Sequence, residues 1–257
     1  MLKIIKPTTP SLRHKIQLIN STERLKNKTL SLNKRKTGGR NFLGKITRRH
    51  LGGGHKQRIK IIDNHANVGA YSKSTIKQFI YDPNRSNYLA LYQTLNNKEF
   101  LKLAPDNQKI GDIIYGKHYP GKKSFNIGNA EFLKNISTGT KIFNIELFPG
   151  SGMKLAKAAG VFAIIIKHNK DITTIKLASK KTINLSSDCL AHIGINSNLN
   201  HNNTILGKAG VKRWLGIRPT VRGEAMNPID HPHGGETSGG VKLKTIYGKL
   251  AKFIKTR

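Results

Sequence analysis

One irregular segment, residues 213–235, restricts the possible folds of this chain more than any other feature. Its sequence, RWLGIRPTVRGEAMNPIDHPHGG, contains three arginines, one tryptophan, two histidines, three prolines and four glycines, and it has no apolar period. Such a segment cannot bury a face of its own and would be disordered as a free loop. It needs a large, irregular polyanion to fold against, and folded RNA meets that description.

The charge of the chain indicates the same partner. The sequence has 46 Lys+Arg against 13 Asp+Glu, a formal net charge of +33, and self-repulsion on this scale opposes a compact state unless counter-charge is supplied. Each phosphate contact would release condensed counterions, so binding would be tight and strongly salt-dependent. A membrane surface or an acidic protein would also attract this charge. The excess runs from Lys3 to Arg257, however, which favours a partner that touches the whole molecule.

The apolar residues are unevenly distributed. They concentrate between about Ile59 and Ile195, and both ends are poor in them, which predicts a globular middle with two basic extensions. The longest apolar run, residues 161–166, is far too short to span a bilayer, so we expect no membrane span. The single cysteine, Cys189, allows no internal disulfide and is interpreted as a buried small hydrophobe.

Short segments with period-two alternation fill the middle of the chain. In its first half we expect strands over residues 58–63, 74–81, 88–92, 99–103 and 110–115. Short strands at this spacing predict a small closed barrel of the OB type, which is a known binder of nucleic acids.

A second set of strands follows. We expect them over residues 141–148, 161–167, 172–178 and 181–185, and their tight spacing predicts a second small barrel. Residues 153–160 between them fit either a single helical turn or an exposed basic loop. The expected fold class is therefore all-β, with two small barrels and long, irregular, basic N- and C-terminal extensions.

A triple glycine, Gly52–Gly54, lies in the N-terminal extension between the cations Arg48, Arg49 and Lys56. Glycine lacks the side chain that would hold a backbone away from phosphates, so the pattern favours a close RNA contact. A flexible turn is the alternative interpretation.

The only tryptophan, Trp214, stands among cations near the start of the irregular segment. It fits stacking on a base or sugar, and it equally fits packing against the second barrel. Arg213, Arg218 and Arg222 carry planar guanidinium forks suited to phosphates and guanine edges.

The histidines of Asp230-His231-Pro232-His233 allow three interpretations. A carboxylate beside an imidazole suggests a general base, and an H-x-H pair suggests a metal site. Adjacent residues rarely form a catalytic dyad, no serine or cysteine nucleophile stands out, and only Asp230 and Glu236 would complete a metal site. We therefore expect RNA contact here, and neither catalysis nor a bound metal.

Four motifs carry a resemblance to a known family. Residues 207–235 (GKAGVKRWLGIRPTVRGEAMNPIDHPHGG), 38–57 (GGRNFLGKITRRHLGGGHKQ), 81–86 (YDPNRS) and 6–14 (KPTTPSLRH) occur in order along almost the whole chain. Together they resemble the family of universal large-subunit ribosomal protein two. The weakest agreement lies in residues 116–140 and 165–205.

The resemblance implies an OB-fold followed by an SH3-like barrel, with extensions threading into large-subunit rRNA. It implies a non-enzymatic role in subunit assembly, in subunit association and in shaping RNA near the peptidyl-transferase centre. The domains expected from it are a basic N-terminal extension, an OB-fold, an SH3-like barrel and a basic C-terminal extension, over residues 1–58, 59–127, 128–196 and 197–257.

Cationic, polar and aromatic side chains along the chain are expected to contact rRNA. They are Arg40, Arg48, Arg49, His50, His55, Lys56, Arg58, Arg85, Lys154, Lys208, Lys212, Arg213, Trp214, Arg218, Arg222 and Asn227. By the resemblance, Asp230, His231 and His233 lie near the peptidyl-transferase centre, where His231 orders RNA and carries no proton. The expected partners are large-subunit rRNA, neighbouring large-subunit proteins and the small subunit through an intersubunit bridge, with no homo-oligomer. No cofactor is expected, and any Mg or K ions would belong to the rRNA.

Two departures from the family pattern bear on location. The family usually continues past His-Pro-His-Gly-Gly with another glycine and a long basic tail, whereas this chain has Glu236 and then residues 237–257. The first motif begins at Lys6, which leaves no room for an import presequence ahead of it. Lysine outnumbers arginine, and isoleucine and asparagine are abundant, as an AT-rich genome would produce. We therefore expect a mitochondrion-encoded protein, with a plastid or an AT-rich bacterium as the alternatives.

Two other classes of protein compete with this interpretation. A non-ribosomal architectural protein that binds DNA or RNA through charge alone would explain the net charge and the glycine-rich arms, but not the ordered motifs. A metal- or histidine-dependent hydrolase is less consistent still, because flexible arms provide no rigid set of catalytic groups.

Overall fold

The computed structural model describes residues 2–19, 22–23, 25, 27–66, 73–116, 126–235 and 243–251. Two compact units divide the chain. The first, here called the barrel unit, consists of residues 1–35 and 56–209, and the second, here called the extension unit, consists of residues 36–55 and 210–257. Each unit is described by itself.

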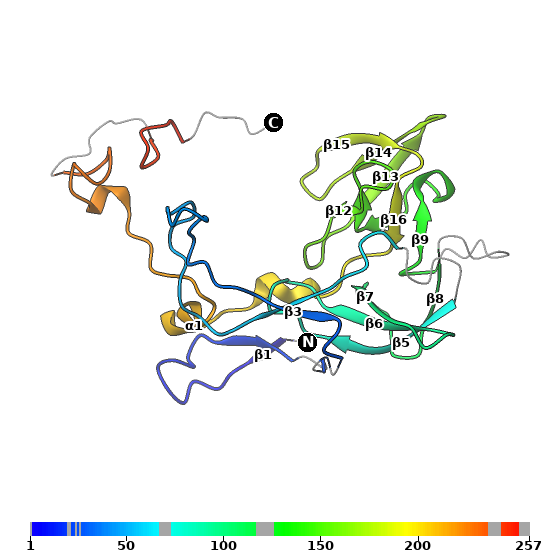
Figure 1. The fold of residues 1–257 in the computed structure, drawn as a ribbon, viewed down its shortest axis with the longest axis horizontal. Helices are drawn as coiled ribbons and strands as arrows, with labels where there is room; N and C mark the ends of the chain where they lie inside the picture. Colours follow the sequence, from blue (N-terminus) through cyan, green and yellow to red (C-terminus); the bar gives the residue numbers. More distant parts are fainter. Residues whose placement is uncertain are drawn as a thin grey trace. The chain divides into compact units, whose positions relative to one another are not determined.

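The first sheet of the barrel unit has four antiparallel strands in the order β7-β6-β5-β8 (Figure 1). The strands are β5 (Lys73–Ile80), β6 (Leu89–Thr94), β7 (Glu99–Leu103) and β8 (Ile113–Tyr115). They correspond to four of the five strands predicted here. The fifth, β4 (Arg58–Lys60), pairs instead with β3 (Ser31–Asn33), so among the described residues this sheet is a half-barrel rather than a closed five-stranded barrel.

The second sheet of the barrel unit has six strands in the order β15-β14-β13-β10-β16-β9, all antiparallel. They are β9 (Ala130–Phe132), β10 (Lys141–Phe143), β13 (Ala163–His168), β14 (Ile172–Lys176), β15 (Thr182–Ser186) and β16 (Leu190–Ile193). The meander β13-β14-β15 confirms the three strands expected there. The sequence interpretation did not anticipate β9 and β16.

Short elements complete the described chain, and the all-β fold class is confirmed. They are β1 (Leu2–Ile4), β2 (Ile16–Leu18), β11 (Ile145–Glu146), β12 (Met153–Leu155), η1 (Leu133–Asn135), η2 (Leu199–Asn203), α1 (Ala209–Trp214) and η3 (Gly223–Ala225). Both interpretations of residues 153–160 were wrong for their first three residues, because β12 pairs with β11 and Met153 is buried. No helix in the described part of the chain is long and apolar enough to cross a membrane.

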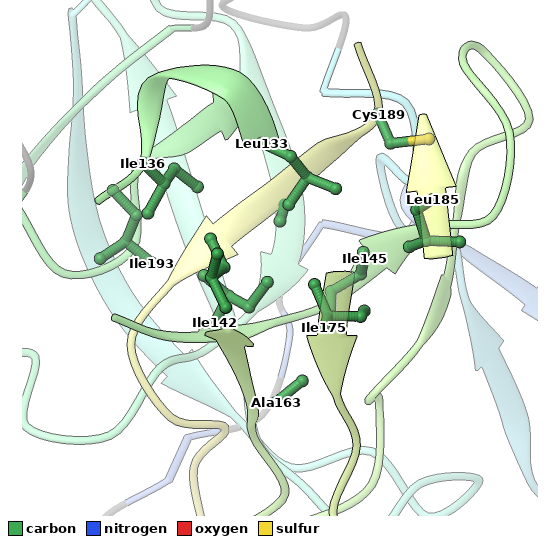
Figure 2. Close-up of a cluster of buried hydrophobic side chains, with 11 residues drawn as sticks. Leu133, Ile136, Ile142, Ile145, Ala163, Ile175, Leu185, Cys189 and Ile193 are labelled. Atoms are coloured by element: carbon green, nitrogen blue, oxygen red, sulfur yellow. The ribbon is translucent and has the colours of Figure 1, made fainter. Parts of the chain in front are cut away.

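Isoleucine and leucine side chains from the six-stranded sheet, from η1 and from β11 form one core. Leu133, Ile142, Ile145 and Ile175 are fully buried and turn toward one another, with Cys189 in the same cluster (Figure 2). The sequence interpretation of Cys189 is confirmed, and burial raises the pKa of its thiol to about 11. A thiol in this state is a small hydrophobe rather than a nucleophile.

The two sheets share part of their cores. Phe143 extends from β10 into a cluster with Ile80, Leu89 and Leu101 of the first sheet. The buried Asn87, ahead of β6, donates from Nδ2 to Oδ1 of Asn196, which follows β16, at 2.9 Å. The two small sheets therefore form one folded unit.

A histidine is buried between these sheets. His192 is 2 % exposed, lies 5.4 Å from the ring of Phe143, and is 3.1 Å from Asn144 Nδ2 through Nδ1. Burial, and then the charge of Lys102, lower the pKa of His192 to about 3. The imidazole is therefore held neutral.

This burial predicts a pH dependence of folding stability. Below pH 6.5 the unfolded chain binds a proton at His192 that the folded chain does not bind until about pH 3, so the free energy of unfolding falls as the pH falls through that window. When the pH falls from 8 to 5, we expect this group alone to lower the free energy of unfolding by roughly 2 kcal/mol. Urea unfolding of the wild type and of His192→Gln at both pH values measures the difference. Equal losses in the two proteins would contradict the prediction.

Candidate nucleic-acid interface

The extension unit is built by pairing two segments that are far apart in the sequence. Leu51 forms a β-bridge with Ile217, Gly52 N donates to Gly216 O at 2.9 Å, and His55 N donates to Trp214 O at 2.8 Å. The N-terminal glycine motif thus gains backbone partners from the irregular segment, which supplies no strand of its own.

The glycines of this pairing allow the two backbones to approach closely. Gly54 has a φ of +77°, and a Cβ built on it would lie 2.6 Å from Gly216 N and 2.9 Å from Trp214 O. Lys36 donates from its ammonium to the carbonyl of Gly54. Gly53, by contrast, has open space around it. The flexible-turn interpretation therefore does not hold for Gly54, which is a packing position.

A cavity of about 640 Å³ opens beside this pairing. Its lining residues are Gly38, Arg40, Ile46, Arg48, Arg49, His50, Leu51, Gly52, Gly53 and Arg218. We call it the arginine cavity. Four guanidinium groups and no carboxylate are found among these described residues, so an anion is the ligand that its charge favours.

His50 adds a fixed hydrogen-bonding group to the arginine cavity. Its Nδ1 lies 3.0 Å from the carbonyl oxygen of Pro219. Because a carbonyl can only accept, Nδ1 carries the proton, and in the neutral ring Nε2 is then an acceptor. An acceptor beside arginines suits a ribose hydroxyl next to its phosphate.

The His-Pro-His motif forms a locally bonded loop. His231 Nδ1 accepts the backbone N–H of His233 at 3.0 Å, His233 Nε2 accepts that of Lys244 at 3.0 Å, and the two rings are 4.9 Å apart. A Cβ at Gly223 would overlap the His231 ring. Both rings thus hold backbone in place, which is a structural use of the histidines.

No group of three His, Cys, Asp or Glu side chains within the described ranges is arranged to hold a metal ion. Glu236, the second carboxylate that a metal site at this loop would use, lies outside the described residues, as does most of the C-terminal tail.

The expected RNA-binding residues fall into two sets. Arg40, Arg48, Arg49, His50 and Arg218 line the arginine cavity. In the same unit but outside the lining lie His55, Lys212, Arg213, Trp214, Arg222 and Asn227, together with Asp230, His231 and His233. All of this second group are exposed except the partly buried His231 and the buried His233.

Other expected residues belong to the barrel unit, namely Lys56, Arg58, Arg85, Lys154 and Lys208. Arg58 Nε donates to Asn33 Oδ1 at 3.3 Å, and Arg85 Nε lies 3.5 Å from Asp82 Oδ2. Arg58 and Arg85 are thus tied to their own unit by polar contacts.

Trp214 is 61 % exposed and stands at the end of α1. The stacking interpretation of Trp214 is consistent with that exposure.

Two lysines with defined contacts were not among the expected site residues. Lys36 bonds the carbonyl of Gly54, and Lys34 Nζ donates to Asn84 Oδ1 at 2.7 Å. The run of cations at residues 34–36 is the sequence feature that could have pointed to these two lysines. A run alone, however, does not distinguish a lysine that bonds to the protein from one that faces solvent.

Comparison with known families gives matches over most of the chain. The model for the RNA-binding N-terminal domain of ribosomal proteins L2 matches residues 27–116, and that for their C-terminal domain matches residues 126–250. The large ribosomal subunit protein uL2 of Buchnera aphidicola subsp. Schizaphis graminum is 47 % identical over 98 % of this chain and 92 % of its own length.

Other bacterial relatives agree with these matches. The uL2 proteins of Wolbachia pipientis subsp. Culex pipiens and of Rhodospirillum centenum are 42 % and 40 % identical. In both cases the match covers 100 % of this chain and 94 % of the relative.

Proposed function

Because the chain belongs to the ribosomal protein L2 family, it is a structural protein of the large ribosomal subunit and not an enzyme, and we propose that the arginine cavity is the centre of its contact with rRNA. The observation that carries this proposal is the convergence of four arginines and His50 on one cavity of the extension unit. Guanidinium forks bind phosphate oxygens in pairs.

The proposed interface extends beyond the cavity. It includes the exposed cations and polar groups on both units and Trp214 as a stacking platform, which are the side chains expected from the sequence to contact rRNA. Any magnesium or potassium ions at this interface would be held by the RNA. The proposed domains are the basic extensions 1–58 and 197–257 and the two barrels 59–127 and 128–196.

The His-Pro-His loop is proposed to lie near the peptidyl-transferase centre. His231 Nδ1 and His233 Nε2 each accept a hydrogen bond from a backbone N–H group. These bonds support a role in shaping the loop and the RNA around it. We extend the proposal to subunit assembly, to contacts with neighbouring large-subunit proteins, and to an intersubunit bridge with the small subunit.

The proposed location is the mitochondrial matrix, with the gene in the organelle genome. The excess of lysine over arginine and the abundance of isoleucine and asparagine support an AT-rich genome. The relatives named above are bacterial, so a bacterial cytoplasm is the main alternative and a plastid the other. Sequencing the genomic context of the gene tests this, and a nuclear or bacterial locus would contradict it.

Sedimentation of the native chain from a lysate, with and without ribonuclease, tests the ribosomal assignment. At moderate salt we expect the chain to co-migrate with the large subunit and to move to light fractions once the RNA is digested. A chain that stays light without ribonuclease, or that follows DNA, would instead favour the architectural protein that binds nucleic acid through charge alone.

A further inference from the structure

A short hairpin, Arg40–Ile46, projects an aromatic ring from the extension unit. Arg40 and Ile46 form a β-bridge, and Asn41 N donates to Lys45 O at 2.9 Å. The side chain of Asn41 closes the loop, since its Oδ1 accepts the backbone N–H groups of Leu43 at 3.1 Å and of Lys45 at 3.0 Å. The β-bridge and these three hydrogen bonds therefore fix the backbone of the tip.

Phe42 occupies that tip and is 94 % exposed. Among the described residues no large apolar side chain is more exposed. A phenyl ring has no polar group to hydrate, so a fixed backbone that holds it in water leaves its apolar surface unburied. Such a ring indicates a partner that covers it.

The surroundings of the tip identify the chemistry of that partner. Residues 36–55 contain five lysines and arginines and no aspartate or glutamate. Arg40, at the base of the hairpin, also lines the arginine cavity. The positive charge around Phe42 favours an anionic partner, and the exposed ring favours one with a flat apolar face. An unpaired nucleobase attached to its phosphates offers both.

We propose that Phe42 stacks on an unpaired base of large-subunit rRNA, while the neighbouring arginines hold the phosphates beside that base. This proposal rests on the proposed rRNA contact of the arginine cavity. It adds a second stacking residue, after Trp214, to an interface otherwise described by charge. Since every base has a π-face, the contact fixes the position of a nucleotide without selecting its sequence.

The test measures the affinity of the full chain for large-subunit rRNA transcribed from the same genome, across a salt series. Phe42→Ala should weaken binding by roughly 5- to 150-fold, the range for loss of one base stack. The dependence of affinity on salt should not change, because no charge is removed. Phe42→Trp should bind as the wild type does, and Phe42→Leu should resemble Phe42→Ala. Chemical probing of the RNA should show one base that the wild type protects and Phe42→Ala does not.

Leu95→Ala is the matched control. Leu95 is 73 % exposed in the turn between β6 and β7, so Leu95→Ala removes a similar exposed apolar group and should leave affinity unchanged. If the wild type binds rRNA and Phe42→Ala binds it equally tightly, only the stacking proposal is overturned. Full rescue by Phe42→Leu, without a protected base, would show that any apolar side chain serves at this position, and would also overturn the stacking proposal. A wild-type chain that does not bind rRNA would overturn the proposed function itself.

Discussion

Replacing Gly54 by alanine is expected to separate the two segments of the extension unit and to abolish high-affinity rRNA binding. The added methyl group would lie 2.6 Å from Gly216 N, a distance that requires one backbone to move. The positive φ adds a cost of about 1–2 kcal/mol, and the forced displacement adds roughly 1–3 kcal/mol. Thermal unfolding and rRNA affinity of the full-length variant measure the effect.

Gly53→Ala is the control for this substitution. Gly53 has a φ of +64° but nothing within 4 Å of its built Cβ, so the variant carries the backbone strain without the collision. We expect Gly53→Ala to lose about 1–2 kcal/mol of stability and to retain most of its affinity. If the two variants behave alike, the close approach of Gly54 to Gly216 does not matter and strain alone explains the loss.

The second large effect is expected from removing three charges of the arginine cavity together. In the combined variant Arg48→Gln, Arg49→Gln, Arg218→Gln, the slope of log affinity against log salt should become shallower by about 2.1 to 2.7. At 0.1 M salt this corresponds to a loss of affinity of roughly 100- to 500-fold. Filter binding of rRNA over a salt series gives both quantities.

A matched charge-removal variant separates this site from a general effect of net charge. Lys170, Lys180 and Lys181 are exposed at the turns that flank β14 and lie in the region of weakest family resemblance. Changing all three to glutamine removes the same charge, and we expect a much smaller change of slope. Equal slopes for the two triple variants would show that affinity follows total charge, and the cavity would lose its special role.

Much of the fold was predictable because strands buried on one face leave a visible alternation. The run Lys73–Ile80 and the meander from Ala163 to Ser186 carry that pattern, and both were located from the sequence. The strand β16 was missed because all four residues, Leu190–Ile193, are buried, so no alternation appears. The pairing of β4 with β3 was not readable, because register between distant strands is set by packing.

The candidate site was predictable in its residue types but not in its assembly. The cations and glycines of residues 38–57 indicated close contact between backbone and a partner. For Gly54 that partner is the protein's own Gly216. No local pattern reveals such a contact, since it depends on two irregular segments that meet only in the folded chain. Phe42 was not among the expected site residues, because the sequence alone does not show whether an aromatic residue in a loop is buried or exposed.

The pairing of Gly52 and His55 with residues 214–216 also sets an order of events during synthesis. A ribosome releases residues 36–55 long before it makes the segment that completes their backbone bonds. Until Arg218 has emerged, the arginine cavity lacks one of its walls. Before that point a nascent chain offers rRNA an incomplete site, and the full set of lining residues exists only in chains that extend past Arg218. Prematurely terminated chains are expected to compete poorly for a place in the subunit.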